Sequence, residues 1–259
     1  MSLYLLPVVF TLFFWWFSTG VILYLDGLPV RTFRWSFLSA TVLLALALYG
    51  LSATRGDTSV SGAYLAFTCG LLAWAWQEVG FLLGYVTGPR QSALPAGCTA
   101  WQHFVCAIQT ILYHELALAL TALAVVGLTW NAPNQVGAWT YLLLWAMRQS
   151  AKLNLFLGVR NLNEQFLPAH LRYLQSYFTK RRMNLLFPVS ILASTLLAFL
   201  IWRDALSGYA QAFEATGLTL VGTLLTLAIL EHWFMVLPLP SEALWKWGLH
   251  SRRDSGVQH

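Results

Sequence analysis

Seven ionisable side chains stand within long apolar stretches of this sequence. A histidine precedes a glutamate in "TILYHELALAL", and the same two types follow in reverse order in "AILEHWFMVL". An isolated charge in hydrocarbon costs roughly 2.5 to 3.5 kcal/mol on insertion scales, so such groups face inward and pair. The seven residues are Glu78, His114, Glu115, Arg148, Lys152, Glu231 and His232.

These residue types allow three kinds of site. The first is an ion-pair network that fixes helix register, in which three carboxylates face two cations. A protonated carboxyl, a histidine or a bound cation then neutralises the remaining negative charge. The second is a transition-metal site, because carboxylates and imidazoles on several helices hold two iron or manganese ions in bundle proteins. Its candidate ligands are Glu115, His114, Glu231 and His232.

The third kind of site is axial ligation of a tetrapyrrole by His114 or His232. The spacing counts against the known two-metal pattern, which uses Glu-x-x-His. Here the histidine and glutamate are adjacent, and adjacent helical residues point about 100° apart. The cofactor therefore stays open between a tetrapyrrole, a transition metal and none, and the pattern identifies no catalytic residue.

The composition indicates that these groups lie in a protein surrounded by lipid rather than by water. Of 259 residues, 58% are hydrophobic and 10% are charged, whereas a soluble domain carries about a quarter charged residues. Runs of roughly 20 apolar residues recur, long enough to cross a bilayer as helices. Alternating ten-residue strand patterns are absent, which argues against an outer-membrane barrel. The sequence predicts an all-α, multi-pass integral membrane protein with a single transmembrane domain over residues 1–259.

The apolar runs divide into seven predicted spans, separated by turn signals such as "DGLPVR" and "NAPNQ". No connection is long enough to hold a soluble domain. The spans cover about 4–25, 35–53, 61–87, 102–128, 135–158, 184–203 and 215–237.

Basic residues in the connections predict the orientation. The first, third and fifth connections and the tail hold eleven: Arg31, Arg34, Arg90, Arg160, Arg172, Lys180, Arg181, Arg182, Lys246, Arg252 and Arg253. The other connections hold Arg55 and Arg203. We therefore expect the N-terminus outside and the C-terminus in the cytoplasm.

With this orientation, all seven ionisable residues fall in one layer, from the bilayer centre toward the cytoplasm. Spans 102–128 and 215–237 run in opposite directions, so His114 and His232 each lie on the cytoplasmic side of the neighbouring glutamate. This shared vertical order predicts a common site between the two helices. We expect Glu115, Glu231 and Arg148 to face one another there, with Glu78 and Lys152 nearby.

The deeper tryptophans allow two interpretations, packing with lipid contact or the lining of a site for a flat aromatic ligand. We favour packing. These residues are Trp15, Trp16, Trp74, Trp76, Trp145 and Trp233.

The fifth connection predicts an interfacial amphipathic helix over about 164–179. Its apolar residues follow helical spacing: Leu167, Leu171, Leu174 and Phe178. Polar residues beside it lie just below the ionisable layer and form a predicted cytoplasmic closing loop. They are Asn161, Asn163, Glu164 and His170.

Four stretches resemble one family: "QEVGFLLGYVTGPR", "TILYHELAL", "MRQSAKLNLFLGVRNLNEQFLPAHLRYLQSYF" and "EHWFMVLPLP". The sequence is similar there to the photosynthetic complex assembly protein family PuhE of purple phototrophic bacteria. The likeness runs from the third predicted span to the end of the seventh. It implies a multi-pass protein of the bacterial inner (cytoplasmic or intracytoplasmic) membrane, encoded near reaction-centre genes. No family catalytic residue is carried over to this sequence.

The resemblance implies an assembly factor for reaction-centre and light-harvesting complexes that influences bacteriochlorophyll supply. Its expected partners are the reaction-centre and antenna proteins and the lipid bilayer, with no nucleic acid. The alternative function is a membrane metal-dependent oxidoreductase acting on a pigment precursor or a lipid. That alternative predicts stoichiometric metal in the ionisable layer, and the sequence does not favour an enzyme.

Overall fold

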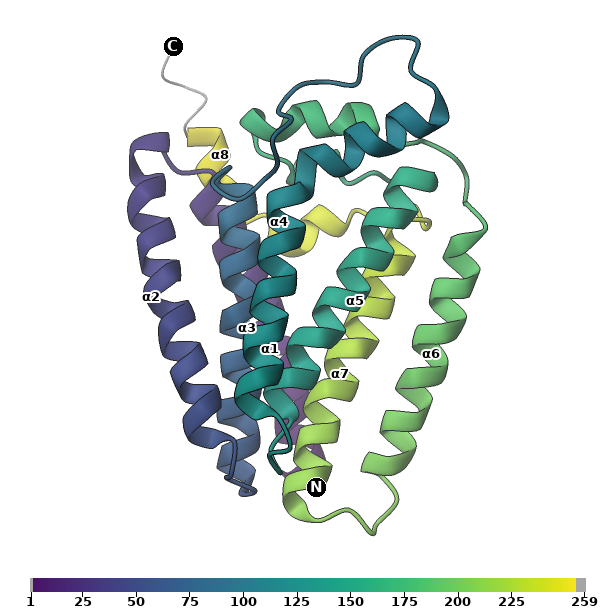
Figure 1. The fold of residues 1–259 in the computed structure, drawn as a ribbon. Coiled ribbons are helices and arrows are strands. Elements are labelled where there is room, and N and C mark those ends of the chain that lie inside the picture. Colours follow the sequence, from purple (N-terminus) through teal and green to yellow (C-terminus); the bar gives the residue numbers. More distant parts are fainter. Residues whose placement is uncertain (1, 255–259) are drawn as a thin grey trace.

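The computed structural model describes residues 2–254 as a bundle of long helices that run between two ends (Figure 1). The long helices are α1 (Ser2–Asp26), α2 (Val30–Thr54), α3 (Val60–Leu82), α4 (Ala100–Thr129), α5 (Val136–Leu157), α6 (Leu186–Ala205) and α7 (Ala212–Phe234). The short ones are η1 (Glu164–Phe166), η2 (Ala169–Tyr177), η3 (Ser241–Trp245) and α8 (His250–Asp254). Within residues 2–254 no strand forms, and the predicted all-α class of multi-pass membrane protein is confirmed.

Among the described residues, six of the long helices are long and apolar enough to cross a bilayer. The exception is α5, which has 22 residues but carries Arg148, Gln149, Lys152 and Asn154. It packs against α3, α4 and α7, so helices rather than lipid surround much of its surface. A central position therefore accommodates the polar residues that lower its hydropathy.

Local sequence sets the ends of the helices that carry the site. At the start of α3 the Ser59 hydroxyl accepts a hydrogen bond from the Gly62 N–H (3.0 Å). Thr99 and Gln102 form a reciprocal capping box at the start of α4. Gly158 ends α5 with a φ of 118°, a backbone conformation that glycine adopts without a steric penalty.

The central helices approach closely because small residues lie at their contacts. A Cβ added to Gly70 of α3 would lie 2.6 Å from the carbonyl oxygen of Gly137 in α5. A Cβ added to Gly137 would lie 2.7 Å from the carbonyl oxygen of Ala66. Close backbone contact of this kind stabilises helix pairs in lipid, where the hydrophobic effect does not drive association.

One end of the bundle carries the basic connections. The α1–α2, α3–α4 and α5–α6 connections and the segment after α7 all lie at this end, which is the upper end in Figure 1. The short helices η1, η2 and α8 lie there as well, whereas η3 packs deeper, against Trp15 and Trp16 in the middle of α1. We refer to this end of the bundle as the basic end, and its placement in the cytoplasm stays a prediction.

The segment predicted as an amphipathic helix over 164–179 is instead two 3₁₀ helices, η1 and η2, separated at Pro168. Leu171, Leu174 and Tyr177 are buried, and their spacing of three residues matches the three residues per turn of a 3₁₀ helix. The expected α-helical spacing was therefore wrong at Phe178, which is half-buried while Tyr177 takes the inner position.

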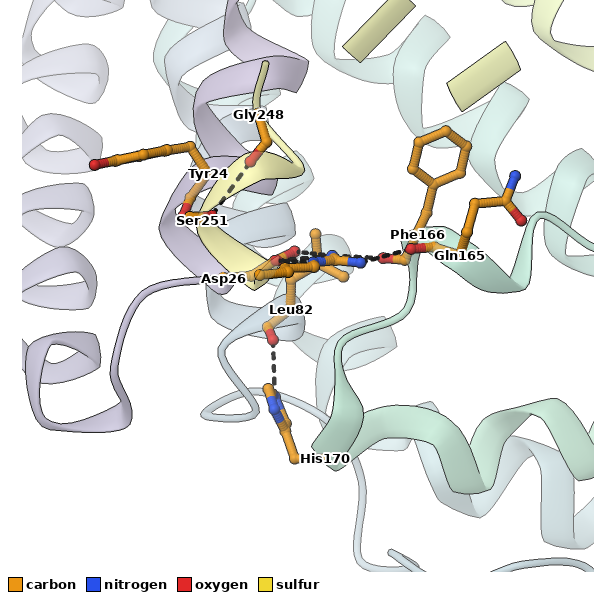
Figure 2. A network of polar contacts seen from close by, with 9 residues as sticks. Tyr24, Asp26, Leu82, Gln165, Phe166, His170, Gly248 and Ser251 are labelled. Atoms are coloured by element: carbon orange, nitrogen blue, oxygen red, sulfur yellow. Dashed lines mark hydrogen bonds and ion pairs between the residues drawn. The ribbon is translucent and has the colours of Figure 1, made fainter. Parts of the chain in front are cut away.

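An ion pair ties the C-terminal helix to the first helix and to η1 (Figure 2). The Arg252 guanidinium donates to both carboxylate oxygens of Asp26, at 2.8 and 2.7 Å. It also donates to the carbonyl oxygens of Gln165 (2.6 Å) and Phe166 (2.9 Å). Three segments that are distant in sequence are thus held together over the bundle.

Candidate functional site

A cavity of about 650 Å³ lies within the bundle. Residues of α1, α3, α4, α5 and α7 line it, together with Trp245, and residues of the 163–178 segment line it at the basic end. Its volume is in the range of small-molecule sites, roughly 300 to 1,000 Å³. Six of the seven ionisable residues singled out from the sequence line this cavity: Glu78, Glu115, Arg148, Lys152, Glu231 and His232.

The first charged pair joins α3 to α5. The Arg148 guanidinium donates through Nη2 to Oε2 of Glu78. The Glu78 side chain is 11% exposed, whereas that of Arg148 is 40% exposed and lies along the cavity. The other carboxylate oxygen of Glu78 is buried and has no hydrogen-bond partner among the described residues. This oxygen can accept one more hydrogen bond.

The second charged pair joins α4 to α5. The Lys152 ammonium donates to Oε1 of Glu115 at 2.6 Å, and the Gln149 amide donates to Oε2. Both oxygens of Glu115 are therefore paired, and its charge is balanced within the site.

The third carboxylate, Glu231 of α7, has a neutral partner. The Trp15 indole of α1 donates to its Oε1 at 2.6 Å, and no cation among the described residues forms an ion pair with it. Much of its side chain is exposed, and this surface borders the cavity that Glu231 lines. Of the three carboxylates, Glu231 is the one that forms no ion pair with a cation of the described residues.

Both ring nitrogens of His232 are engaged. Nδ1 lies 2.9 Å from the carbonyl oxygen of Ala228, which can only accept, so Nδ1 carries the proton. Nε2 of the neutral ring then accepts from the Ser150 hydroxyl at 2.9 Å. This histidine ties α7 to α5 beside the cavity.

His114 does not line the cavity. Its ring is buried and packs against Phe81, with ring centroids 4.7 Å apart. Its backbone N–H donates to the Thr87 carbonyl at 2.9 Å, because α3 ends at Leu82 rather than at the predicted residue 87. The segment after α3 therefore packs against α4 at His114, whereas Glu115 faces the cavity.

The predicted common site between α4 and α7 takes a different form. α5 contacts both helices, so Glu115 and Glu231 border the same cavity without pairing. Glu78, rather than Glu115 or Glu231, is the partner of Arg148. The mirrored order of the two His–Glu motifs accordingly does not produce a matched pair of histidines.

The geometry does not favour ligation of a metal or a tetrapyrrole by the two histidines. Both nitrogens of His232 form hydrogen bonds, which leaves its ring no lone pair for a metal. The ring of His114 lies away from the cavity. Across residues 2–254 no three His, Cys, Asp or Glu side chains come together as metal ligands.

The remaining wall of the cavity is mostly apolar and aromatic. Two of the deep tryptophans, Trp15 and Trp74, line it, and so does Trp245, whose ring centroid lies 5.1 Å from that of Trp15. Phe104 of α4 and Phe156 of α5 also line it, with ring centroids 5.9 Å apart. Such a wall suits an apolar molecule with few polar groups.

Of the four predicted closing residues, Asn163 lines the cavity. Asn161 instead ties the segment to the end of α7, because its amide donates to the carbonyl oxygens of Phe234 and Leu237. His170 donates through Nε2 to the Leu82 carbonyl at 2.9 Å (Figure 2). Glu164 is exposed and does not line this cavity.

Three neutral side chains complete the site, although the sequence analysis did not assign them to it. Gln149 binds Glu115, Ser150 binds His232, and Trp15 binds Glu231. Gln149 and Ser150 lie between Arg148 and Lys152 in the sequence, so their polarity inside a span was a usable signal. Trp15 gave no such signal, because its partner lies 216 positions further along the chain.

Fold and site together define a class, a helical multi-pass membrane protein with an internal cavity that combines charged pairs and aromatic walls. The chain belongs to the family described as "Protein of unknown function (DUF3623)", which matches residues 1–256. It is 40% identical over 250 residues to the "Uncharacterized 30.4 kDa protein in puhA 5'region" of Rhodobacter capsulatus, covering 94% of this chain and 90% of the relative. No solved structure matches the chain.

Proposed function

We propose that this protein assists the assembly of photosynthetic reaction-centre and light-harvesting complexes in the bacterial inner membrane. The observation that carries the proposal is the 40% identity, over nearly the full chain, to a protein encoded in the puhA 5' region. That location fits a photosynthesis gene cluster. It agrees with the resemblance to the PuhE family, which was based on the residues of α3 to α7.

The cavity supplies a physical basis for such a role. An assembly factor must hold an apolar component before it is delivered, and this cavity of about 650 Å³ is bordered mainly by apolar side chains. The charged pairs between α3 and α5 and between α4 and α5 fix the helices around it. We therefore place the function in the cavity, with the reaction-centre and antenna proteins as partners.

Deletion of the gene in its native phototrophic host tests the proposal. We expect lower absorption from reaction centres and antenna in intact membranes, together with unchanged respiratory growth. Complementation should restore the spectrum. A deletion strain with a normal absorption spectrum under phototrophic conditions would refute the assembly function.

Substitution of two alanines on α5 tests whether the function depends on the cavity. Ala151 lines the cavity, whereas Ala146 is exposed on the same helix and does not line it. Ala151→Trp should obstruct part of the cavity and fail to restore the complexes, whereas Ala146→Trp should restore them. Immunoblots must show equal amounts of both variants. If Ala151→Trp complements fully at that level, the cavity has no part in assembly.

A further inference from the structure

The polar groups that the cavity leaves unsatisfied are carboxylate oxygens. Oε1 of Glu78 is buried without a hydrogen-bond partner in the described part of the chain. Glu231 receives one hydrogen bond, from the neutral Trp15 indole. Oε1 of Glu78 has no accessible surface, whereas Glu231 is exposed and lines the cavity. A carboxylate that borders an apolar cavity is costly to leave without donors, so a bound group that donates hydrogen bonds would stabilise Glu231.

The two cations of the cavity do not make it favour an acidic ligand over one that donates hydrogen bonds. Arg148 is bonded to Glu78, and Lys152 is bonded to Glu115 at 2.6 Å. Each positive charge thus already faces a carboxylate. Glu231 has no ion-pair partner in the described part of the chain, so a ligand with a hydroxyl or amino group matches it better than one with a carboxylate.

The cavity has apolar walls on the side of α4 and α5. Ile108 of α4 and Leu153 of α5 both line it, and they are 39% and 45% exposed. Beyond them the outer face of α4 is apolar, with Leu116 and Leu120 exposed. An apolar molecule can therefore reach the cavity from the bilayer, between the ends of α4 and α5.

We propose that the cavity binds an elongated apolar molecule whose polar end is a hydroxyl or an amino group. The apolar body lies against the aromatic walls, and the polar end donates hydrogen bonds to the Glu231 carboxylate. The molecule enters from the lipid between α4 and α5. This binding is a property of the isolated protein and does not depend on the assembly function.

Three probes with the same chain length and different polar ends test the proposal. Tritiated cetyl alcohol, cetylamine and methyl palmitate are titrated onto the full chain in lipid nanodiscs, and saturable binding is measured against an excess of the unlabelled probe. Cetyl alcohol and cetylamine should each occupy one saturable site. Methyl palmitate accepts hydrogen bonds but donates none, so it should bind at least about tenfold more weakly than cetyl alcohol.

Two carboxylates of α7 supply a matched pair of variants. Glu231→Gln keeps an acceptor for Trp15 and for the alcohol but removes the charge, so cetylamine should bind about tenfold more weakly while cetyl alcohol changes little. Glu214→Gln is the control, because Glu214 is exposed in the capping box of α7 and glutamine serves that box equally well. It should leave both affinities unchanged.

Binding inside the cavity is tested with Ala151→Trp, which should abolish saturable binding, and with Ala146→Trp, which should preserve it. Equal binding of methyl palmitate and cetyl alcohol would overturn the donor assignment. Binding of cetylamine that is unaffected by Glu231→Gln would overturn the role of that carboxylate. The wild-type probe series and the Glu231→Gln measurement decide the matter even if Ala151→Trp fails to fold.

Discussion

Arg148→Met removes one partner of the ion pair between α3 and α5 and leaves the other in place. The Glu78 carboxylate is 11% exposed, and its second oxygen has no partner in the described structure. Removing one side of a buried pair costs roughly 3 to 5 kcal/mol. Because the Arg148 side chain is 40% exposed toward the cavity, we expect the lower end, a loss of about 3 kcal/mol.

Adding Glu78→Gln to this variant should recover much of the stability. The double variant contains no unpaired charge at this position, so it should lose only about 1 kcal/mol relative to the wild type. The two substitutions are therefore strongly non-additive. Unfolding by SDS in mixed micelles, followed by circular dichroism, measures the free energy of unfolding of each variant.

An exposed ion pair provides the control. Arg203 and Asp204 are 2.7 Å apart, with side chains 60% and 56% exposed, so Arg203→Met should cost less than about 1 kcal/mol. If Arg148→Met costs no more than Arg203→Met, or if the Glu78 and Arg148 substitutions are simply additive, the ion pair does not stabilise the bundle and our reasoning about it is wrong.

Three further predictions concern orientation, pH dependence and packing. Reporter fusions at Lys180 should be cytoplasmic and those at Tyr209 periplasmic, and the opposite result would reverse the orientation. Burial lowers the pKa of His170, and the positive charge of Arg252 lowers it further. The hydrogen bond to the Leu82 carbonyl raises the pKa but offsets only part of this shift. The unfolded chain therefore binds more protons than the folded one below about pH 6.5. The stability that the neutral ring contributes is present above that pH and is lost as pH falls toward the folded pKa, so acidification should destabilise the wild type more than His170→Gln in the same unfolding assay. Gly70→Ala should cost roughly 1 to 3 kcal/mol because its Cβ would meet the Gly137 carbonyl at 2.6 Å, whereas Gly127→Ala, with open space around it, should be neutral or stabilising; equal effects would contradict the close packing.

The sequence predicted the fold class and the group of residues around the cavity better than it predicted their pairing. Charges inside apolar runs must face protein rather than lipid, so Glu115, Glu231 and Arg148 were expected to face one another, with Glu78 and Lys152 nearby. Their partners depend on helix rotation and on which helices are neighbours. A Trp15–Glu231 hydrogen bond requires α1 to pack beside α7, which no local pattern indicates.

The two errors of local structure also have physical explanations. His114 and Glu115 were treated as one motif, although adjacent residues of a helix point about 100° apart; one faces Phe81 and the other the cavity. The apolar residues of the 169–177 segment fit the three residues per turn of a 3₁₀ helix as well as the 3.6 residues per turn of an α-helix. Pro168 and the short length favour separate 3₁₀ turns, and the buried Tyr177 distinguishes the two periods.

The Asp26–Arg252 pair joins positions 226 residues apart, so it links the earliest helix to nearly the last described residues. During synthesis all the long helices can enter the membrane before Arg252 leaves the ribosome. Until then η1 lacks the guanidinium that binds the carbonyl oxygens of Gln165 and Phe166. A nascent or C-terminally truncated chain therefore has a bundle whose cavity is not yet secured at the basic end, and completion of the chain is the step that fastens it.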